Sequence, residues 1–239
     1  MNILITICAR GGSKGIPKKN IKKINNTPLI HYSIDLANKI KEKYKADIQL
    51  STDCDLISKC CKNYGLTDNK YIRPDYLATD EVGKIDTIKH AFNYAEVYYN
   101  KKFDFIIDLD VTSPLRNIDD IEAALIKLIN NKNALNIFSV SPAKRNPYFN
   151  MVEINNKGYA SLVKSEKSFK TRQSSPRVYD MNASFYIYRN KFFNSKNEIS
   201  VNSLSIIYIM DHICFDLDEA VDFDIMEFLI VNNKLDFKF

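Results

Sequence analysis

Apolar, β-prone runs alternate with segments of helical periodicity over the first 140 residues of the chain. The predicted strands are Ile3–Cys8, Asp47–Ser51, 103–109 and 136–140, and helical periodicity marks 28–40, the residues up to 65, 84–99 and the segment after 117. Strands that alternate with helices in this way are typical of a parallel sheet with helices on both faces. The pattern therefore predicts an α/β fold.

Polar and special residues predict where these helices begin and end. Thr27 is predicted to cap the first helix, with Pro28 at its first position. Gly65 is predicted to end the second helix. Asn117 is predicted to cap the helix that follows it, because its side chain can accept from the free backbone N–H groups and two aspartates occupy the first turn.

The pattern changes between 141 and 181. Two short β-prone pieces, 148–154 and 159–163, flank the turn Asn-Asn-Lys-Gly and predict a hairpin, which a polar, basic stretch follows. We interpret 141–181 as an insertion that projects from the main sheet toward a second subunit. The α/β domain then comprises 1–140 and 182–239, with further strands at 183–188, Ser205–Ile209 and 213–216 and a last helix at 219–231.

Composition excludes several classes of protein. An apolar content of 45% with 26% charged residues is ordinary for a soluble globular chain. No apolar stretch approaches the length of a membrane span, and the first residues favour a strand rather than a signal peptide. The five cysteines are scattered without a Cys-x-x-Cys pair, which favours reduced thiols in a cytoplasmic protein over disulfides or zinc.

Residues 9–20 carry the strongest functional signal. They read Ala-Arg-Gly-Gly-Ser-Lys-Gly-Ile-Pro-Lys-Lys-Asn directly after the first predicted strand. Glycines let the backbone approach a ligand, and the cations neutralise phosphate charge. The spacing matches neither a Walker A loop nor a dinucleotide fingerprint. The alternative is a solvated basic loop without a function. The position of the loop directly after the first strand argues against it, because open α/β sheets bind ligands beyond the carboxyl ends of their strands.

The basic segment raises the question of nucleic acid. Six cations and no carboxylate lie between Arg10 and Lys23, and the net charge of the chain is +5. No helix-turn-helix or zinc finger is visible, and aromatic residues are not interleaved with the basic run. A local basic loop fits a small phosphorylated ligand better than a nucleic-acid backbone.

Two pairs of carboxylates are candidates for a metal site. Asp216 and Asp218 lie where a strand is predicted to meet a helix, and residues two apart on a strand project to the same face. Carboxylates together with phosphate oxygens are the usual ligands of Mg²⁺. Asp108 and Asp110 have the same spacing, and each pair has the alternative of a helix cap or a solvated strand end. The three histidines, at 31, 90 and 212, are interpreted as structural.

The first loop resembles that of the CMP-sugar synthetases, the cytidylyltransferases that activate nine-carbon acidic sugars. Supporting stretches cover essentially the whole chain: Ser51-Thr52-Asp53, Arg73-Pro74, Leu77-Ala78-Thr79-Asp80, Thr112-Ser113-Pro114-Leu115-Arg116, Arg172-Gln173, Asn182, Tyr186 and Asp216-Leu217-Asp218. The opening loop together with the late Asp-x-Asp is a specific combination. The resemblance implies a three-layer, Rossmann-like nucleotide-sugar transferase fold with a mostly parallel sheet and a small β-rich dimerisation insertion.

The family reaction joins CTP and a 2-keto sugar acid into a CMP-sugar and pyrophosphate. The resemblance implies that the nucleotide is held by Ala9, Arg10, Gly11, Lys14, Lys19, Asn20, Arg73, Ala78, Thr79 and Asp80, and the sugar by Asp110, Thr112, Ser113, Phe149, Arg172, Gln173, Asn182 and Tyr186. It implies catalytic roles for Arg10, Lys14, Lys19 and Asp216, and a Mg²⁺ site at Asp216 and Asp218. It also implies a homodimer in which the insertion lends Arg172 to the neighbouring site.

The sequence departs from the sialic acid members of this family near the sugar. Asp110-Val111 stands where those enzymes carry Gln-Pro, Phe149 lies where they commonly place a lysine, and Asp180 replaces a basic residue. Such changes alter the groups that the sugar can pair with. The chain is most similar to CMP-legionaminic acid synthetases. Sialic acid, the eight-carbon keto-deoxy-octonate, a non-catalytic nucleotide-binding protein of the same fold and a nucleic-acid binder are the alternatives.

Overall fold

A six-stranded sheet forms the centre of the molecule. The computed structural model describes residues 1–13, 15–66, 70–165, 169–194 and 199–239. Within these ranges the strand order is β10 (Ser205–Ile209), β6 (Asn136–Pro142), β9 (Tyr179–Arg189), β5 (Phe105–Leu109), β1 (Ile3–Cys8) and β4 (Asp47–Ser51). Strand β9 pairs antiparallel with both neighbours, and the other pairings are parallel. The predicted α/β fold with a mostly parallel sheet is confirmed.

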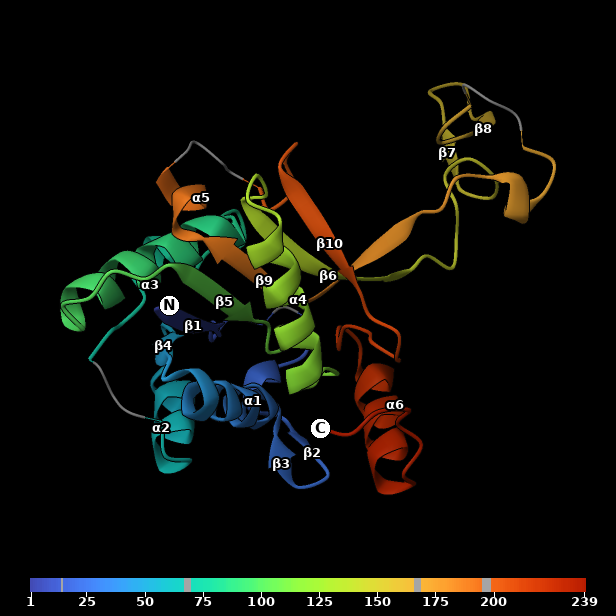
Figure 1. Cartoon of the computed structure of the whole chain (residues 1–239). Coiled ribbons are helices and arrows are strands. Elements are labelled where there is room, and N and C mark those ends of the chain that lie inside the picture. Colours follow the sequence, from blue (N-terminus) through green and yellow to red (C-terminus); the bar gives the residue numbers. More distant parts are fainter. Residues whose placement is uncertain (14, 67–69, 166–168, 195–198) are drawn as a thin grey trace.

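Helices cover both faces of this sheet, as the alternation of side chains along the strands requires (Figure 1). On β1, Ile3, Ile5 and Ile7 belong to a core with α1 (Leu29–Tyr44), α2 (Asp55–Asn63), α4 (Ile118–Asn130) and α6 (Ala220–Val231). Leu4 points to the opposite core, with α3 (Lys84–Tyr98) and α5 (Asn190–Asn194). The result is three layers, with both cores fully buried.

Helix α4 begins as the sequence predicts, whereas α1 does not. The Asn117 side chain accepts from the backbone N–H of Asp120 at 3.0 Å, and the Asp120 carboxylate accepts from the N–H of Asn117 at 2.9 Å. The predicted cap at Thr27 and first helical position at Pro28 are wrong. Both residues form β3 (Thr27–Pro28), which pairs with β2 (Lys23–Ile24) across Asn25 and Asn26. Positive φ angles of 46° and 62° at these asparagines give the tight hairpin turn that they favour.

The strand predicted at 213–216 is also wrong, because these residues form no strand in the described structure. The Ile213 backbone N–H, which a ladder would use, instead donates to the Asp236 carboxylate at 3.1 Å. Farther on, Leu217 donates to the Thr112 carbonyl at 2.8 Å and is fully buried. The chain therefore leaves the edge of the sheet after β10 and crosses to the ends of the central strands.

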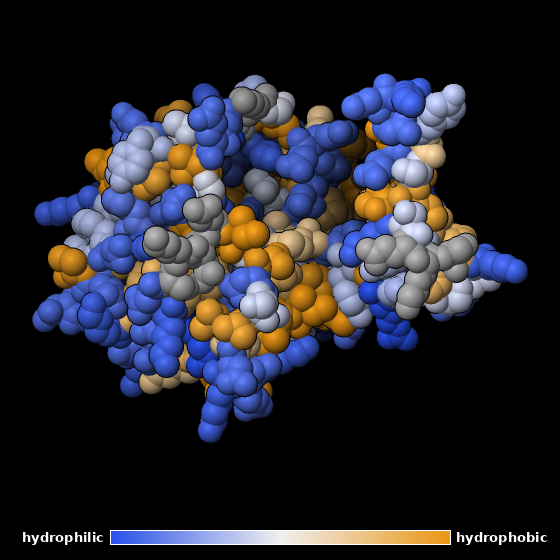
Figure 2. Space-filling model, turned by 90° about the horizontal axis from the view of Figure 1, so that it is seen from above, coloured by the Kyte–Doolittle hydropathy of each residue, from blue (hydrophilic) through white to orange (hydrophobic). Residues whose placement is uncertain are grey.

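The segment between β6 and β9 forms an arm that stands away from the sheet (Figure 1). The predicted hairpin is present as β7 (Val152–Ile154) and β8 (Ala160–Leu162), with a φ of 83° at Gly158 in its turn. Apolar side chains gather on the arm (Figure 2). Val152, Ile154 and Tyr159 are 62%, 74% and 71% exposed. No helix in the described ranges is long and apolar enough to cross a membrane.

His212 joins α4 to the end of the chain. Its Nε2 lies 2.9 Å from the Asp120 carboxylate, its Nδ1 lies 3.0 Å from the Ile213 carbonyl, and its ring stacks on Phe237. Burial alone would lower the pKa of His212, but the two hydrogen bonds outweigh burial and raise the pKa above 6.5. The protonated imidazole is thus favoured in the folded chain.

Replacing His212 by Gln is expected to destabilise the protein mainly at acidic pH. Because the folded pKa is raised, the stabilisation is complete below the unfolded pKa and is lost as the pH rises through the folded pKa. We expect the free energy of unfolding to fall by on the order of 1 kcal/mol at about pH 5.5, and by less at about pH 8.5. Denaturant unfolding of both proteins at the two pH values measures this difference, and an equal loss at both would contradict it.

Candidate active site

A cleft of about 440 Å³ opens at the carboxyl ends of β1 and β5. This is a typical size for a ligand pocket and the usual place for one in an open α/β sheet. Predicted site residues that line it are Arg10, Lys19, Asn20, Arg73, Thr79, Asp80, Asp110, Thr112 and Asp218. Residues far apart in the sequence are thus brought to one cavity. Ala9, Gly11 and Ala78 lie in the same segments but do not line the cleft, and Lys14 lies outside the described residues.

Two side chains, those of Asp53 and Asn20, hold the glycine-rich loop by hydrogen bonds to its backbone. The Gly11 N–H donates to the Asp53 carboxylate at 2.8 Å, and a Cβ at this position would lie only 2.8 Å from the Cβ of Cys54. The Asn20 side chain, 7% exposed, donates to the Arg10 carbonyl at 2.9 Å. Asn20 therefore fixes the loop as well as bordering the cleft, and Gly11 is required by the close approach of Cys54.

Two cations of this loop form ion pairs with carboxylates across the cleft. Arg10 lies 2.6 Å from Asp80, and Lys19 lies 3.0 Å from Asp218. Lys18 adopts the left-handed conformation, with a φ of 55°, just before the helical turn that contains Lys19. Non-glycine residues adopt this conformation uncommonly, and often at functional sites. Phosphate oxygens can replace these carboxylates as partners, because both pairs border the cleft.

Arg73 forms part of the floor of the cleft. It is 5% exposed, and its guanidinium donates to the Ser51 hydroxyl at 3.1 Å and to the Ser51 carbonyl at 2.7 Å. These bonds tie the segment before Leu77 to the end of β4. Arg73 therefore contributes a positive charge whose position is set by the sheet.

Asp216 and Asp218 lie on either side of the buried Leu217, and of the two only Asp218 lines the cleft. One carboxylate oxygen of Asp216, Oδ1, is buried without a hydrogen-bond partner among the described residues. Burial, with repulsion from Asp110 and Asp218, raises the pKa of Asp216 to about 6, although the neighbouring Ser113 hydroxyl opposes the rise. Asp218 is exposed and forms the pair with Lys19.

These two carboxylates fit a hard divalent cation that takes its other ligands from elsewhere. The described residues contain no group of three or more His, Cys, Asp or Glu side chains placed to hold a metal. A Mg²⁺ ion usually takes one or two carboxylates, water and substrate phosphates. The unpartnered oxygen of Asp216 meets that requirement. Asp108 and Asp110, the other pair, both contact Lys84 instead.

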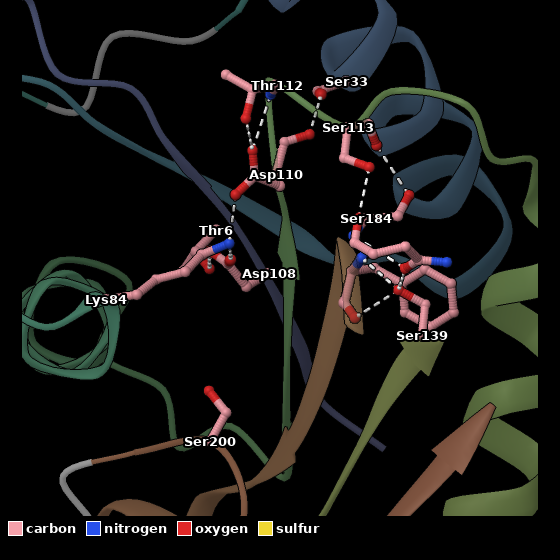
Figure 3. Close-up of polar contacts among 12 residues, drawn as sticks. Thr6, Ser33, Lys84, Asp108, Asp110, Thr112, Ser113, Ser139, Ser184 and Ser200 are labelled. Atoms are coloured by element: carbon pink, nitrogen blue, oxygen red, sulfur yellow. Dashed lines mark hydrogen bonds and ion pairs between the residues drawn. The ribbon is translucent and has the colours of Figure 1, made fainter. Parts of the chain in front are cut away.

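Asp110 and Thr112 line the cleft and contact each other, and their hydrogen bonds can be followed in Figure 3. Asp110 Oδ1 accepts from the backbone N–H of Thr112 at 2.8 Å and from its hydroxyl at 2.9 Å, and Oδ2 lies 2.7 Å from Lys84 Nζ. Burial alone would raise the pKa of Asp110, but the charge and hydrogen bonds of these partners lower it below the usual value. Lys84 also lines the cleft, and no sequence motif marks it as a site residue.

The remaining predicted sugar residues do not line the cleft. Ser113 and Asn182 are buried behind it, where the Ser113 hydroxyl donates to the Asn182 carbonyl at 2.6 Å and Tyr186 packs under the Lys84 ammonium at 4.7 Å. Phe149, Arg172 and Gln173 lie on the arm, where the Arg172 guanidinium donates to the Ala143 carbonyl at 3.0 Å. The fold of one chain thus separates the arm residues from the cleft.

Arg116 supports the wall that carries Asp110. It is 2% exposed, and its guanidinium donates to the carbonyls of Asp110, Ser113 and Ser184 and to the Ser33 hydroxyl at 2.6–2.9 Å. Burial lowers the pKa of Arg116 to about 10, so it remains charged at neutral pH. The structure therefore gives Arg116 a supporting role behind the site.

Replacing Arg116 by Lys is expected to destabilise the fold strongly. An ammonium cannot reproduce the planar fork of donors, and it leaves buried carbonyls without partners. We expect a loss of about 3 kcal/mol in the free energy of unfolding, measured by denaturant titration. Arg177→Lys on the exposed part of the arm is the matched control. Equal unfolding midpoints for both variants would contradict this role.

The fold and the cleft define a class of enzyme. A mostly parallel sheet with a glycine-rich basic loop after its first strand, facing acidic residues across a ligand-sized cleft, is the arrangement of a nucleotidyltransferase. Residues 4–234 match the sequence model of the family described as Cytidylyltransferase, and the chain belongs to this family.

Individual relatives agree with this assignment. The chain is 41% identical over 229 residues to a CMP-N,N'-diacetyllegionaminic acid synthase of Campylobacter jejuni, covering 95% of this chain and 94% of that protein. It is 40% identical to the post-translational flagellin modification protein B of Campylobacter coli, covering 99% of this chain and 98% of the relative. A solved CMP:2-keto-3-deoxy-manno-octonic acid synthetase with CTP has the same fold, with a TM-score of 0.69 at 14% identity, covering 98% of this chain and 100% of that one.

Proposed function

We propose that this protein transfers CMP from CTP to the anomeric hydroxyl of a nonulosonic acid, namely legionaminic acid or a derivative, and releases pyrophosphate. The contact between Lys19 and Asp218, at 3.0 Å across the cleft, carries the proposal. It joins the basic first loop to the Asp-x-Asp of the C-terminal region, and a triphosphate fits between cations and a metal-binding carboxylate pair. The likeness to a legionaminic acid synthase supports the choice of sugar.

The basic loop provides charge stabilisation for the triphosphate. Arg10 and Lys14 are assigned to the departing pyrophosphate and Lys19 to the oxygens of the α-phosphate. The hydroxyl of the sugar attacks phosphorus in line with the leaving group, so the protein has to position and neutralise the reactants rather than form a covalent intermediate. Asn20, Arg73 and the segment at 78–80 are assigned to the cytidine.

Asp216 and Asp218 are assigned to magnesium. When bound, a Mg²⁺ ion supplies polarisation of the phosphate oxygens and neutralises their charge. Before substrates bind, Lys19 competes for Asp218, and its release to a phosphate frees this carboxylate. Arrival of the anion therefore prepares the metal site in the same step.

The arm is assigned to a homodimer. Between 141 and 181 the chain carries eight Lys and Arg against three Asp and Glu, a difference of +5 that equals the net charge of the whole chain. Its apolar residues are exposed in the single subunit (Figure 2). A second copy would cover these side chains and bring Phe149, Arg172 and Gln173 to the neighbouring cleft, where cations favour an anionic sugar and nucleotide.

Pyrophosphate release tests the proposed function directly. The protein is supplied with CTP, Mg²⁺ and, separately, legionaminic, sialic, pseudaminic and keto-deoxy-octonic acids. We expect pyrophosphate to be released when CTP, Mg²⁺ and an accepted sugar are all present. The highest kcat/KM is expected with a legionaminic acid. Efficiency with sialic acid equal to or above that with legionaminic acid would overturn the choice of sugar. An absence of release with every sugar would overturn the enzymatic proposal.

A further inference from the structure

Lys84 occupies a position that its own helix disfavours. It is the first residue of α3, after Gly83, and cations are unfavourable near the positive end of a helix. The unfavourable interaction between the lysine and the helix dipole has to be offset by other contacts of the fold. Here it comes from two carboxylates of the central sheet. Lys84 Nζ lies 2.8 Å from Asp108 and 2.7 Å from Asp110 (Figure 3).

Asp108 anchors the ammonium from below. It lies on β5, is fully buried, and accepts from the hydroxyl of Thr6 on the neighbouring strand β1 at 2.7 Å. The ring of Tyr186 packs against the same ammonium at 4.7 Å. A buried carboxylate requires a charged partner, and this pair of strands supplies no other cation to Asp108 among the described residues. Lys84 is consequently held in one position at the border of the cleft.

Asp110 is fixed in the same way and leaves one acceptor site open. A carboxylate offers about four acceptor positions. Thr112 donates twice to Oδ1, and Lys84 binds Oδ2, which accounts for three of them. Lys84 has three N–H donors; it donates to Asp110 and forms an ion pair with Asp108, so at least one donor remains for a ligand. Both residues line the cleft, so they present one donor and one acceptor side by side.

The charge of this cluster determines what it can bind. Asp108, Lys84 and Asp110 together carry a formal charge of −1, which disfavours a carboxylate or a phosphate. The cations of the first loop, Arg10 and Lys19, line another part of the same cleft. The anionic groups of the substrates therefore belong with the loop, and the cluster faces a neutral part of the ligand.

We propose that Lys84 is a specificity-determining residue, which together with Asp110 selects a sugar bearing a neutral hydrogen-bonding substituent, hydroxyl or acylamido, at this end of the cleft. This inference rests on the proposed function. The Asp110 carboxylate accepts from an O–H or N–H of the sugar, and the ammonium donates to a hydroxyl or carbonyl oxygen. A site built to pair with such groups rejects a sugar that lacks them, because its own buried polar groups then remain unpaired.

The test separates this role from simple support of the fold. Lys84→Met alone would leave Asp108 buried without its charge partner, so the change is made in the Asp108→Asn background, and Asp108→Asn alone is the control. We expect the added change to raise KM for the sugar at least about tenfold while KM for CTP stays within about twofold. The preference for the accepted sugar over a deoxy analogue, in which hydrogen replaces one hydroxyl or acylamido group, should shrink by a similar factor.

Three outcomes would be informative. Equal increases in both KM values, or an unchanged sugar preference, would overturn the selective role of Lys84. Unchanged kinetics with lower thermal stability would show that the lysine only supports the fold. If the unmodified protein releases no pyrophosphate with any acidic sugar, the proposed function itself fails. Calorimetry with CTP then shows whether the cleft binds the nucleotide.

Discussion

Replacing Asp216 by Asn is expected to abolish most of the turnover while leaving the protein at least as stable. Loss of a metal-binding carboxylate should lower kcat by about 10²–10⁴-fold, because the developing charge on the phosphates is no longer neutralised. The same substitution is expected to raise the free energy of unfolding, although it lowers turnover. Burial raises the pKa of Asp216 from 3.8 to about 6, so the ionised form is disfavoured in the folded chain.

The pH dependence of this stability effect follows from the linkage between folding and protonation. A raised carboxyl pKa destabilises the fold fully above the folded pKa, and the cost disappears below the unfolded pKa. We therefore expect Asp216→Asn to be more stable than the unmodified protein by about 1–2 kcal/mol near pH 7.5, and equally stable at about pH 3. Denaturant unfolding with a chelator present measures the difference.

A nearby aspartate provides the control for this experiment. Asp224 is exposed on α6 and does not line the cleft. Asp224→Asn should change neither turnover nor the pH dependence of stability. Normal turnover of Asp216→Asn would move the proposed metal site away from this loop, and a loss of stability at neutral pH would show that the ionised carboxylate has a partner that supports the fold.

The sequence predicted those features of the fold that are determined locally. Strand β1 was predicted with its correct bounds because an uninterrupted apolar run is buried on both faces. The start of α4 was predicted because Asn117 and Asp120 form a reciprocal cap within four residues. The predicted α1 cap is wrong because the turn at Asn25 and Asn26 places Thr27 in a hairpin, and this local signal competes with the helix cap.

Non-local contacts account for the other differences. The segment at 213–216 has apolar, β-prone residues, but its backbone donor is taken by Asp236, which lies 23 residues farther along the chain. Lys84 was missed for the same reason, since its partner Asp110 lies 26 residues away and the two meet only when α3 packs on the sheet. The basic loop and the late carboxylates were found because each is a short motif. Their catalytic and binding roles stay predictions.

Replacing Arg172 by Met is expected to reduce kcat/KM at least about thirtyfold, although Arg172 does not line the cleft of its own subunit. The arm stands away from the body (Figure 1). The guanidinium of Arg172 donates to the Ala143 carbonyl on the same arm at 3.0 Å. Because the arm stands away from the cleft of its own chain, we expect Arg172 to act on another copy of the chain. Size measurement should therefore show a dimer.

Mixed dimers decide between action within one subunit and action across two. A purified heterodimer of Arg172→Met and Asp216→Asn contains one cleft with an intact Asp216 that faces an intact arm, and one doubly defective site. If the arm serves its neighbour, this heterodimer should recover about half of the unmodified activity, because one of two symmetric sites is restored. Pairing Arg172→Met with the double variant Arg172→Met/Asp216→Asn is the control, since no intact arm remains. If neither pairing recovers activity, Arg172 acts in the site of its own subunit. In that case each cleft of the heterodimer carries one of the two substitutions.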